Sequence, residues 1–514
     1  PSKRKFLRIE LTRSYYASKK AAKFLMDYCK EDDIPSMHRG VYEMCPRLVD
    51  SYLKNSGMSG FDWACSHTGK RLEVQPPDTQ TIPLKSIVFD IETLSPTGQT
   101  FAERGHKVGI IAVMLRPQDK MEVFVLKGDE TGQVELTEST HAARIIHFET
   151  ELEMLEAFRR RVLEHDPDFI IGHNSNSFDF PYICTRLKLL GSKEWNHWSR
   201  LGEEYPVQYV RRMLQGQGGS MKDVVEIYCP GRIFLDTLRC AESDVGLKLN
   251  GRKLSDIAEA LDLGAKDDVS YEEIWPLFHG NSEDRGRLVS YAIRDVIITK
   301  EFVDARKYQS STIASSKVYR VIPRDALDRG ISYQLARKLF TSCRDEYLLP
   351  SKLHDGYLHG SITASPQEVK LRQDGIDGAY VFSPVVDLYR SPSHVGVLDF
   401  NSLYPSIIMR HNICHTTFIH SVEYAKKLGL REEDLYFAPS GDDGQPGAIF
   451  VREHVRRGII PTIVKDLIDK RTETRALMKE VKDDPVLLSA LESIQLQYKT
   501  GSNAMYGQFA ARRS

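Results

Sequence analysis

The most constraining stretch of the sequence is residues 86–95, SIVFDIETLS, where two acidic residues interrupt an apolar run. The run has the length of a strand, and the apolar residues on both sides of the acids predict that this strand is central in a sheet. Asp90 and Glu92 are two residues apart, so their carboxylates point to the same face of a strand. A buried acidic pair is costly unless a cation lies between its members. The stretch therefore indicates a divalent-metal site, with a solvated edge strand as the simpler alternative.

Two further acidic residues lie on predicted helices. Asp179 follows Phe178 in HNSNSFDF, near the start of the helix after an apolar strand at residues 169–172. Tyr291 and Asp295 are four residues apart in SYAIRDVIITK, which makes them neighbours on one helix face. Taken alone, Asp179 fits a helix cap and Asp295 fits a solvated position on a surface helix.

A second candidate site lies in residues 396–417, GVLDFNSLYPSIIMRHNICHTT. The apolar residues before Asp399 predict a strand that ends at this carboxylate. Pro405 fits the first turn of a following helix, because the amide that proline lacks would be unpaired there. A strand–turn–helix of this kind points backbone N–H groups outward and suits a phosphate beside a metal-binding carboxylate. The simpler interpretation of Asp399 is a carboxylate favoured by the helix dipole.

Two long helices are predicted near the end of the sequence. Apolar residues recur at helical spacing in residues 456–481, and basic residues including Arg471 lie mostly on the polar side. The second helix, within residues 487–511, places three polar residues along one face, and a glycine follows the last of them. These residues are Lys499, Asn503, Tyr506 and Gly507. A charged stripe is usually only a solvated face, which is the alternative here.

These patterns together resemble the family B DNA polymerases. DFNSLYPSII is similar to motif A of that family, and KTGSNAMYG is similar to motif B, Lys-x-x-x-Asn-Ser-x-Tyr-Gly. The order D-x-E, N-x-x-x-F-D, Y-x-x-x-D resembles the family's 3′→5′ proofreading exonuclease. The resemblance implies an α/β multidomain protein of the delta-like or large-DNA-virus type. Its ribonuclease-H-like exonuclease domain would be followed by a partial palm and helical fingers.

The resemblance implies two-metal phosphodiester hydrolysis at the first site. Its implied ligands for two Mg²⁺ ions are Asp90, Glu92, Asp179 and Asp295. Tyr291 would orient the attacking water or the scissile phosphate, and Phe178 would pack against the terminal base. Asp236, in the strand-like GRIFLDTLR, is interpreted as a structural residue.

The resemblance implies nucleotidyl transfer at the second site. Asp399 would hold the Mg²⁺ ions, the amide of Leu403 would contact the triphosphate, and the ring of Tyr404 would exclude a 2′-hydroxyl. Arg471 would grip the triphosphate, and Lys499 would neutralise the departing pyrophosphate. The remaining substrate contacts are Asn503, Tyr506 and Gly507, with Tyr506 under the nascent base pair.

The sequence departs from the family pattern at three positions of the two helices. Arg475 replaces a usual lysine, and Ala504 replaces the usual serine of motif B. Gly501 lies in mid-helix, where glycine costs roughly 1 kcal/mol relative to alanine.

The resemblance divides the chain into five parts. These are an N-terminal α+β domain (1–84), the exonuclease domain (85–305), a connecting region (306–395), a partial palm with motif A (396–450) and fingers with motif B (451–514). Residues 195–219 are predicted to form a variable loop, and residues 326–340 a helix. The family's later palm carboxylates and thumb are not in the sequence. We therefore expect this length of chain alone not to polymerise DNA.

Composition bears on compartment and partners. Eight scattered cysteines without a C-x-x-C pair argue against a zinc site or a disulfide framework, and predict a reducing compartment, the nucleus or a viral replication compartment. No apolar run is long enough to span a membrane. The net charge of -1 does not indicate a nucleic-acid binder, but acidic centres offset basic grooves in such a sum.

The implied partners are primer-template DNA, deoxynucleoside triphosphates and a sliding clamp or accessory subunit. The alternatives are a stand-alone 3′→5′ exonuclease, which would not need Tyr404, Arg471 or Lys499, and a non-catalytic scaffold of a polymerase complex.

Overall fold

The chain forms two compact units in a computed structural model. The described residues are 62–65, 72–75, 84–127, 142–200, 205–215, 221–263 except 245, 248 and 250, 269–343, 383, 399–400, 402–439 and 447–510. Among these, unit 1 runs through Lys317 and takes in Ile322–Asp328, and unit 2 contains Val318–Val321 and the chain from Arg329. The strand predicted before Asp399 lies outside the described residues, as does most of the predicted N-terminal domain.

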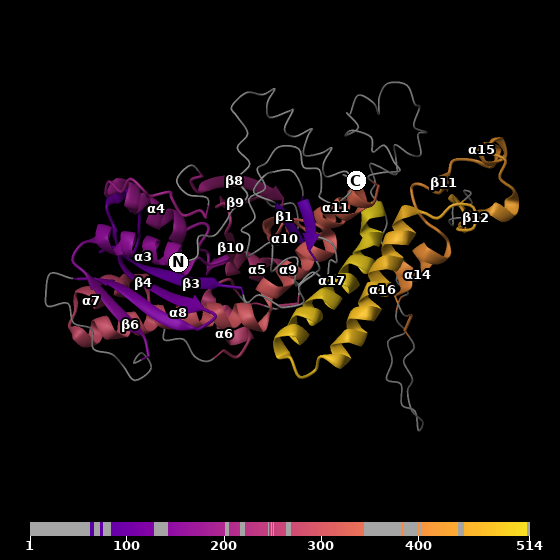
Figure 1. Cartoon of the computed structure of the whole chain (residues 1–514). Helices are drawn as coiled ribbons and strands as arrows, with labels where there is room; N and C mark the ends of the chain where they lie inside the picture. The colour runs from indigo at the N-terminus through magenta and orange to yellow at the C-terminus, as the bar shows by residue number, and fades with distance from the viewer. Residues whose placement is uncertain are drawn as a thin grey trace, which may run out of the picture. The chain divides into compact units, whose positions relative to one another are not determined.

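Unit 1 is built on a mixed six-stranded sheet in the order β10-β7-β3-β4-β5-β6 (Figure 1). The strands are β3 (Ser86–Leu94), β4 (Lys107–Arg116), β5 (Lys120–Leu126), β6 (Arg144–Phe148), β7 (Phe169–Gly172) and β10 (Ile233–Asp236). β3, β4 and β5 form an antiparallel meander, whereas β7 and β10 extend the sheet in parallel with β3 and β6 runs parallel to β5. A separate pair, β1 (Asp62–Cys65) and β2 (Leu72–Gln75), is antiparallel. The predicted central strand is confirmed.

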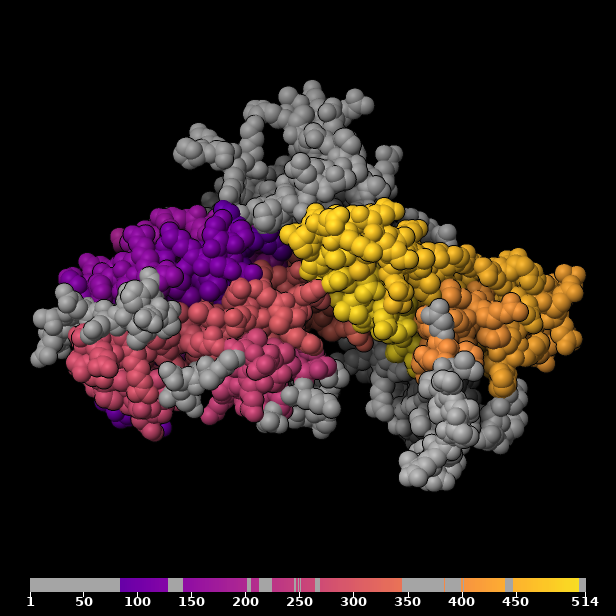
Figure 2. All heavy atoms as spheres, turned by 90° about the horizontal axis from the view of Figure 1, so that it is seen from below, coloured from indigo at the N-terminus to yellow at the C-terminus, as the bar shows by residue number. Residues whose placement is uncertain are grey.

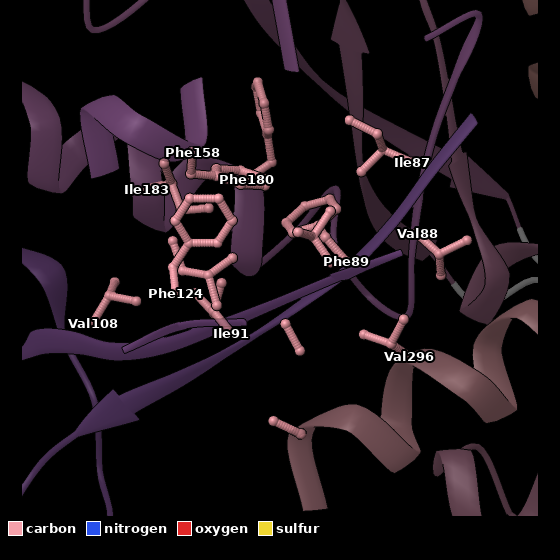
Figure 3. Close-up of a cluster of buried hydrophobic side chains, with 14 of the residues drawn as sticks. Ile87, Val88, Phe89, Ile91, Val108, Phe124, Phe158, Phe180, Ile183 and Val296 are labelled. Atoms are coloured by element: carbon pink, nitrogen blue, oxygen red, sulfur yellow. The ribbon is translucent and has the colours of Figure 1, made fainter. Parts of the chain in front are cut away.

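Helices cover both faces of this sheet. They are α3 (Glu151–His165), α4 (Asp179–Leu189), α5 (Thr237–Ser243), α6 (Leu254–Ala260), α7 (Tyr271–His279), α8 (Ser282–Ala305), α9 (Tyr308–Tyr319) and α10 (Pro323–Asp328). Figure 3 shows Phe89 of β3 among side chains of α3 and α4 such as Phe180, and Val88 turned the other way toward Val296 of α8. Because successive residues of a strand face opposite sides, α3 and α4 cover one face of β3 and α8 covers the other.

Local signals fix where the helices begin. Thr150 and Glu153 form a capping box at the start of α3, in which the Thr150 hydroxyl accepts the Glu153 amide and the Glu153 carboxylate accepts the Thr150 amide. A buried ion pair then joins α3 to α4, because the guanidinium of Arg186 donates to both carboxylate oxygens of Glu151. Glu151 also accepts the amide of Val108 on β4 at 2.9 Å. This network ties α4 to the rest of unit 1.

Two predictions of secondary structure, for residues 195–219 and 326–340, are wrong in detail. Residues 195–219, predicted as a loop, contain β8 (Gln208–Gln215), which pairs antiparallel with β9 (Met221–Tyr228). The helix predicted over residues 326–340 is two helices, α10 and α11 (Ile331–Cys343), which a break at Gly330 separates. Gly330 lacks the side chain that would favour a continuous helix.

Unit 2 is built on a pair of long helices, α16 (Ile459–Glu480) and α17 (Pro485–Ala510), which lie side by side (Figure 1). The helices α11 and α14 (Leu403–Arg410) pack against this pair. A small module follows α14, and its elements are β11 (Phe418–Ile419), α15 (Val422–Lys427), β12 (Leu435–Phe437) and β13 (Ile449–Val451). The two predicted long helices are confirmed.

The described residues also bear on the predicted membrane and thiol properties. No helix among them is long and apolar enough to cross a membrane. Five cysteines in the described part of the chain are buried free thiols, and they are Cys184, Cys229, Cys240, Cys343 and Cys414. The expectation that these cysteines do not form disulfides is confirmed for this part.

Unit 2 buries one lysine that predicts a pH-dependent stability. Lys338 of α11 is 8% exposed and lies 3.7 Å from Asp466 of α16. Burial lowers the pKa of Lys338 to about 8, with Lys470 and Arg320 adding to the shift and Asp466 opposing it. The pKa in the unfolded chain is 10.5. The unfolded chain therefore binds this proton more tightly, and the contribution of Lys338 to stability improves as pH rises from about 8 to 10.5.

We therefore expect Lys338→Met to raise the free energy of unfolding of unit 2 at pH 7 by roughly 2–3 kcal/mol, because it removes a buried charge. The gain should shrink when thermal unfolding is repeated near pH 10. Lys465→Met, at a half-exposed lysine of α16, is the matched control and should change stability by less than about 0.5 kcal/mol. A gain that is the same at both pH values would contradict the prediction.

Candidate functional site

The two acids of β3 lie on the sheet face that α8 covers. Asp90 and Glu92 are two and four residues after Val88, so the three side chains lie on the same face of β3. Figure 3 shows Val88 turned toward Val296 of α8. Glu92 is 5% exposed, and Asp90 is half-buried. The register of β3 with β4 shifts between Glu92 and Thr93, and such irregularities re-aim side chains next to active sites. The predicted acidic pair on a central strand is confirmed.

Helix α8 brings Tyr291 and Asp295 to the same place. Asp295 is 7% exposed, and Tyr291 is half-buried. Burial raises the pKa of the Tyr291 hydroxyl, and the nearby carboxylates of Asp295, Glu92 and Asp90 raise it further. Tyr291 therefore stays a neutral hydrogen-bond donor beside three carboxylates. Helix α8 packs against β3, which brings these side chains close to one another.

Asp179 completes the cluster as the first residue of α4. This helix follows β7, which runs parallel to β3, so it begins at the edge of the sheet where β3 also ends. Burial raises the pKa of Asp179 to about 7, and the charges of Asp236 and Asp295 contribute to the rise. The amide of Ile91, between the two acids of β3, donates to Asp179 and opposes the rise.

These four acidic residues are the candidate ligands for a divalent cation. Glu92, Asp179 and Asp295 are buried and Asp90 is half-buried, and a hard cation with oxygen ligands would relieve the repulsion between neighbouring carboxylates. Among the described residues, no group of three or more acidic, histidine or cysteine side chains is placed so that it could hold a metal ion. The metal ligands Asp90, Glu92, Asp179 and Asp295 therefore stay a prediction.

Asp236 of β10 was interpreted from the sequence as a structural residue. One carboxylate oxygen accepts the amide of Asn174 at 2.9 Å and that of Leu238 at 3.0 Å, and the other accepts the amide of Asn176 at 3.1 Å. Asn174 has a left-handed backbone with φ of 57°. Asp236 thus fixes the loop that delivers Asp179. The sequence gave no direct signal for this contact, because Asp236 ends a short strand about 60 residues after the loop that it binds.

Phe178 lies directly before Asp179 at the start of α4. Its ring centroid is 5.3 Å from that of Tyr182, and its side chain is half-buried. The hydroxyl of Tyr182 donates to the carbonyl of His106 at 2.9 Å, which anchors the second ring. The Phe178 ring therefore packs against the hydrophobic core and remains partly exposed.

The second candidate site brings motifs A and B together in unit 2. Tyr404 in the first turn of α14 stacks on Tyr506 of α17, with ring centroids 4.5 Å apart and planes at 22°. Leu403, the first residue of α14, is 41% exposed. Asp399 is exposed, and the structure describes only Phe400 beside it. Its predicted part in a metal site stays a prediction.

The polar stripe of α17 faces outward beside this tyrosine pair. Lys499, Asn503 and Gly507 are exposed, and Tyr506 is 37% exposed. Arg471 of the neighbouring α16 is half-buried and donates from Nε to the side-chain oxygen of Gln495 at 3.3 Å. The predicted substrate-binding residues of α17 thus lie at accessible positions, and that of α16 is partly covered.

Comparison with known proteins identifies two matching family models. The model described as DNA polymerase family B matches residues 322–514. The model described as the exonuclease domain of DNA polymerase family B matches residues 53–257. Together these models cover about three quarters of the chain, and the second contains Asp90, Glu92 and Asp179.

Relatives and a solved structure agree with these matches. The DNA polymerase delta catalytic subunit of Candida albicans is 28% identical over 89% of this chain and 42% of its own length. That of Oryza sativa subsp. japonica is 29% identical over 83% of this chain and 36% of its own length. The chain therefore spans about two fifths of the curated relatives it matches. The family B DNA polymerase of the hyperthermophilic archaeon Pyrobaculum calidifontis has a similar fold, with a TM-score of 0.60 and 22% identity over 93% of this chain and 55% of that one.

The hydrogen bonds of Asp236 predict a stability effect. Asp236→Asn keeps the shape of the side chain but turns an amide group toward backbone N–H donors that a carboxylate satisfied. We expect the free energy of unfolding of unit 1 to fall by about 1–3 kcal/mol, measured by chemical unfolding. Glu153→Gln, at an exposed capping carboxylate of α3, is the matched control and should cost less than about 1 kcal/mol. Equal losses in the two variants would contradict the role of Asp236.

Proposed function

Because the chain belongs to the family B DNA polymerases, we propose that it is part of a DNA-directed DNA polymerase that replicates DNA and proofreads with a 3′→5′ exonuclease. The observation that carries the proposal is a group of neighbouring acidic residues from three elements: those of β3 and α8 lie close enough to Tyr291 to raise its pKa, and Asp295 of α8 raises the pKa of Asp179 on α4. Three of these carboxylates lie in the residues that the exonuclease model matches. A buried acidic cluster destabilises a fold that has no use for it, so the cluster supports catalysis over a scaffold.

The exonuclease reaction is hydrolysis of the terminal phosphodiester of a single strand. Asp90, Glu92, Asp179 and Asp295 would hold divalent cations, proposed as two Mg²⁺ ions, which when bound supply an activated water and stabilise the leaving 3′-oxygen. The neutral Tyr291 hydroxyl donates a hydrogen bond to the water or to the scissile phosphate. The half-buried Phe178 ring packs against the terminal base and holds the strand end in place.

The polymerase site is proposed for the surface around Tyr404 and Tyr506. Asp399 would take part in holding Mg²⁺, and the amide at Leu403 would donate to the triphosphate. Arg471 and Lys499 supply positive charge for the triphosphate and the departing pyrophosphate. Tyr404 would pack under the deoxyribose, and Tyr506 with Asn503 and Gly507 would line the nascent base pair. The stacking of the two tyrosines favours this reading over a lone nuclease, because it joins two motifs that nuclease activity does not need.

The proposed partners are primer-template DNA, deoxynucleoside triphosphates and a sliding clamp or accessory subunit. The proposed location is the nucleus or a viral replication compartment. The eukaryotic organisms of the matched relatives support the nucleus.

The exonuclease proposal is tested with purified chain, Mg²⁺ and a labelled single-stranded oligonucleotide. Shortening from the 3′ end is the expected result, and Asp90→Ala/Glu92→Ala should slow it by at least about a hundredfold, since even indirect metal partners cost 10–100-fold. Glu164→Ala, at an exposed carboxylate of α3, should leave the rate unchanged. Degradation by the double variant at the wild-type rate would overturn the proposal.

A further inference from the structure

The small module of unit 2 carries a row of aromatic rings on one face of its sheet. The sheet order is β11-β13-β12, and Phe450 of β13 is directly opposite Phe418 of β11 and Tyr436 of β12. Residues opposite one another in antiparallel strands share a face, so these three rings lie on the same side. The rings of His420 and His411 extend the row at its two ends. These five residues are called the aromatic face.

Ring contacts join the residues at each end of the aromatic face, and strand register joins Phe450 to Tyr436 in the middle. Phe418 lies 5.0 Å from His420 and 5.9 Å from Phe450 between ring centroids. Tyr436 stacks on His411 at 4.0 Å with the planes at 24°. The row therefore crosses all three strands from β11 to the end of α14.

The module does not need the aromatic face for its own core. The opposite face of the sheet supplies the buried residues of the module, which are Ile419, Ala425, Leu435, Ile449 and Val451. Phe418 by contrast is 41% exposed, and Tyr436 and Phe450 are half-buried. Figure 2 shows the module as the orange end of unit 2, beyond the yellow pair α16 and α17. A row of large rings at an accessible surface is unusual for a module that already has a core.

Positive charge gathers at one end of the row. Arg410 and Arg452 are exposed and lie near His411, whose pKa is lowered by burial and then by these two charges. Neither arginine forms an ion pair with a carboxylate among the described residues. The acidic Asp434 of the same module is engaged by Arg431 and His454. The surroundings of the aromatic face therefore favour a ligand with negative charge beside flat apolar groups.

We propose that the aromatic face binds single-stranded DNA, with bases stacked on the rings of Phe418, Phe450 and Tyr436. Aromatic side chains on an open antiparallel sheet are a general platform for unpaired bases, because every base has a flat π-face. Arg410 and Arg452 would contact backbone phosphates at the His411 end. The choice of DNA as the occupant rests on the proposed function, since a DNA polymerase meets unpaired template strand. None of the five residues of the aromatic face is among the residues of the two proposed catalytic sites.

The proposal is tested by photocrosslinking the whole chain to a single-stranded oligonucleotide that carries 5-iodouracil, with the cross-linked peptides identified by mass spectrometry. Cross-links are expected at β11, β12 or β13. In a binding titration, Phe418→Ala and Tyr436→Ala should each weaken binding about five- to hundredfold, since a stacked base contributes about 1–3 kcal/mol. Tyr424→Ala, at a tyrosine of α15 that is 47% exposed but lies off the face, is the matched control and should bind as wild type.

Two further measurements keep the outcomes distinct. Phe418→Leu preserves apolar bulk, so loss of cross-links with an unchanged melting temperature separates stacking from unfolding. Arg410→Gln should lower the salt dependence of binding by about 0.7 in log–log slope, as expected for one phosphate contact to a single strand. Cross-links confined to residues 84–305, with 3′→5′ degradation intact, would overturn this inference alone. Absence of both cross-links and degradation would overturn the proposed function with it.

Discussion

Unit 1 depends on one constraint, which is that two carboxylates are held on a central strand whose faces are both covered. Asp90 and Glu92 cannot move to solvent without breaking the sheet, because β3 is paired on both sides and packed by helices. Other acidic side chains can therefore join this pair only at the end of β3. The parallel strand β7 ends at the same edge, so the helix that follows it begins there with Asp179. Helix α8 lies across the covered face and supplies Tyr291 and Asp295.

Other contacts in unit 1 hold these carboxylates in place despite the repulsion between their charges. Burial and like charge raise the pKa of Asp179, which means that ionisation there costs free energy. The Asp236 contacts to the Asn174 and Asn176 amides fix the approach to α4 from one side. The Arg186–Glu151 pair fixes the body of α4 from the other. A fold that spends stability on a crowded anionic site in this way is typical of catalytic rather than purely structural proteins.

Apolar periodicity made some helices and strands predictable from the sequence. Features that depend on how strands pair could not be predicted in this way. The strand carrying Asp90 was clear from its apolar run, and the two long helices of unit 2 were clear from the spacing of their apolar and polar residues. The β8–β9 hairpin was missed because the glycine-rich stretch at residues 216–219 marks a turn as well as a loop. The strands of the module have two or three residues each, too few to show a period, so the aromatic face became visible only when β11, β12 and β13 paired. The positions of the acids could be predicted, but the Asp236 contacts depend on where two non-consecutive strands meet.

The mid-helix glycine of α17 shows how packing resolves a local cost. A Cβ at Gly501 would lie 2.8 Å from a ring carbon of Tyr319, so no larger residue fits there without a shift. The hydroxyl of Tyr319 donates to the carbonyl of Gln497 at 2.8 Å on the same side of the helix. At roughly 100° per residue, Gly501 lies about 160–220° around the helix from Lys499, Asn503 and Tyr506. The contact with Tyr319 therefore sets the rotation of α17 and aims the polar stripe outward. The glycine penalty is offset by this contact, which the local sequence of α17 could not reveal because its partner lies about 180 residues earlier.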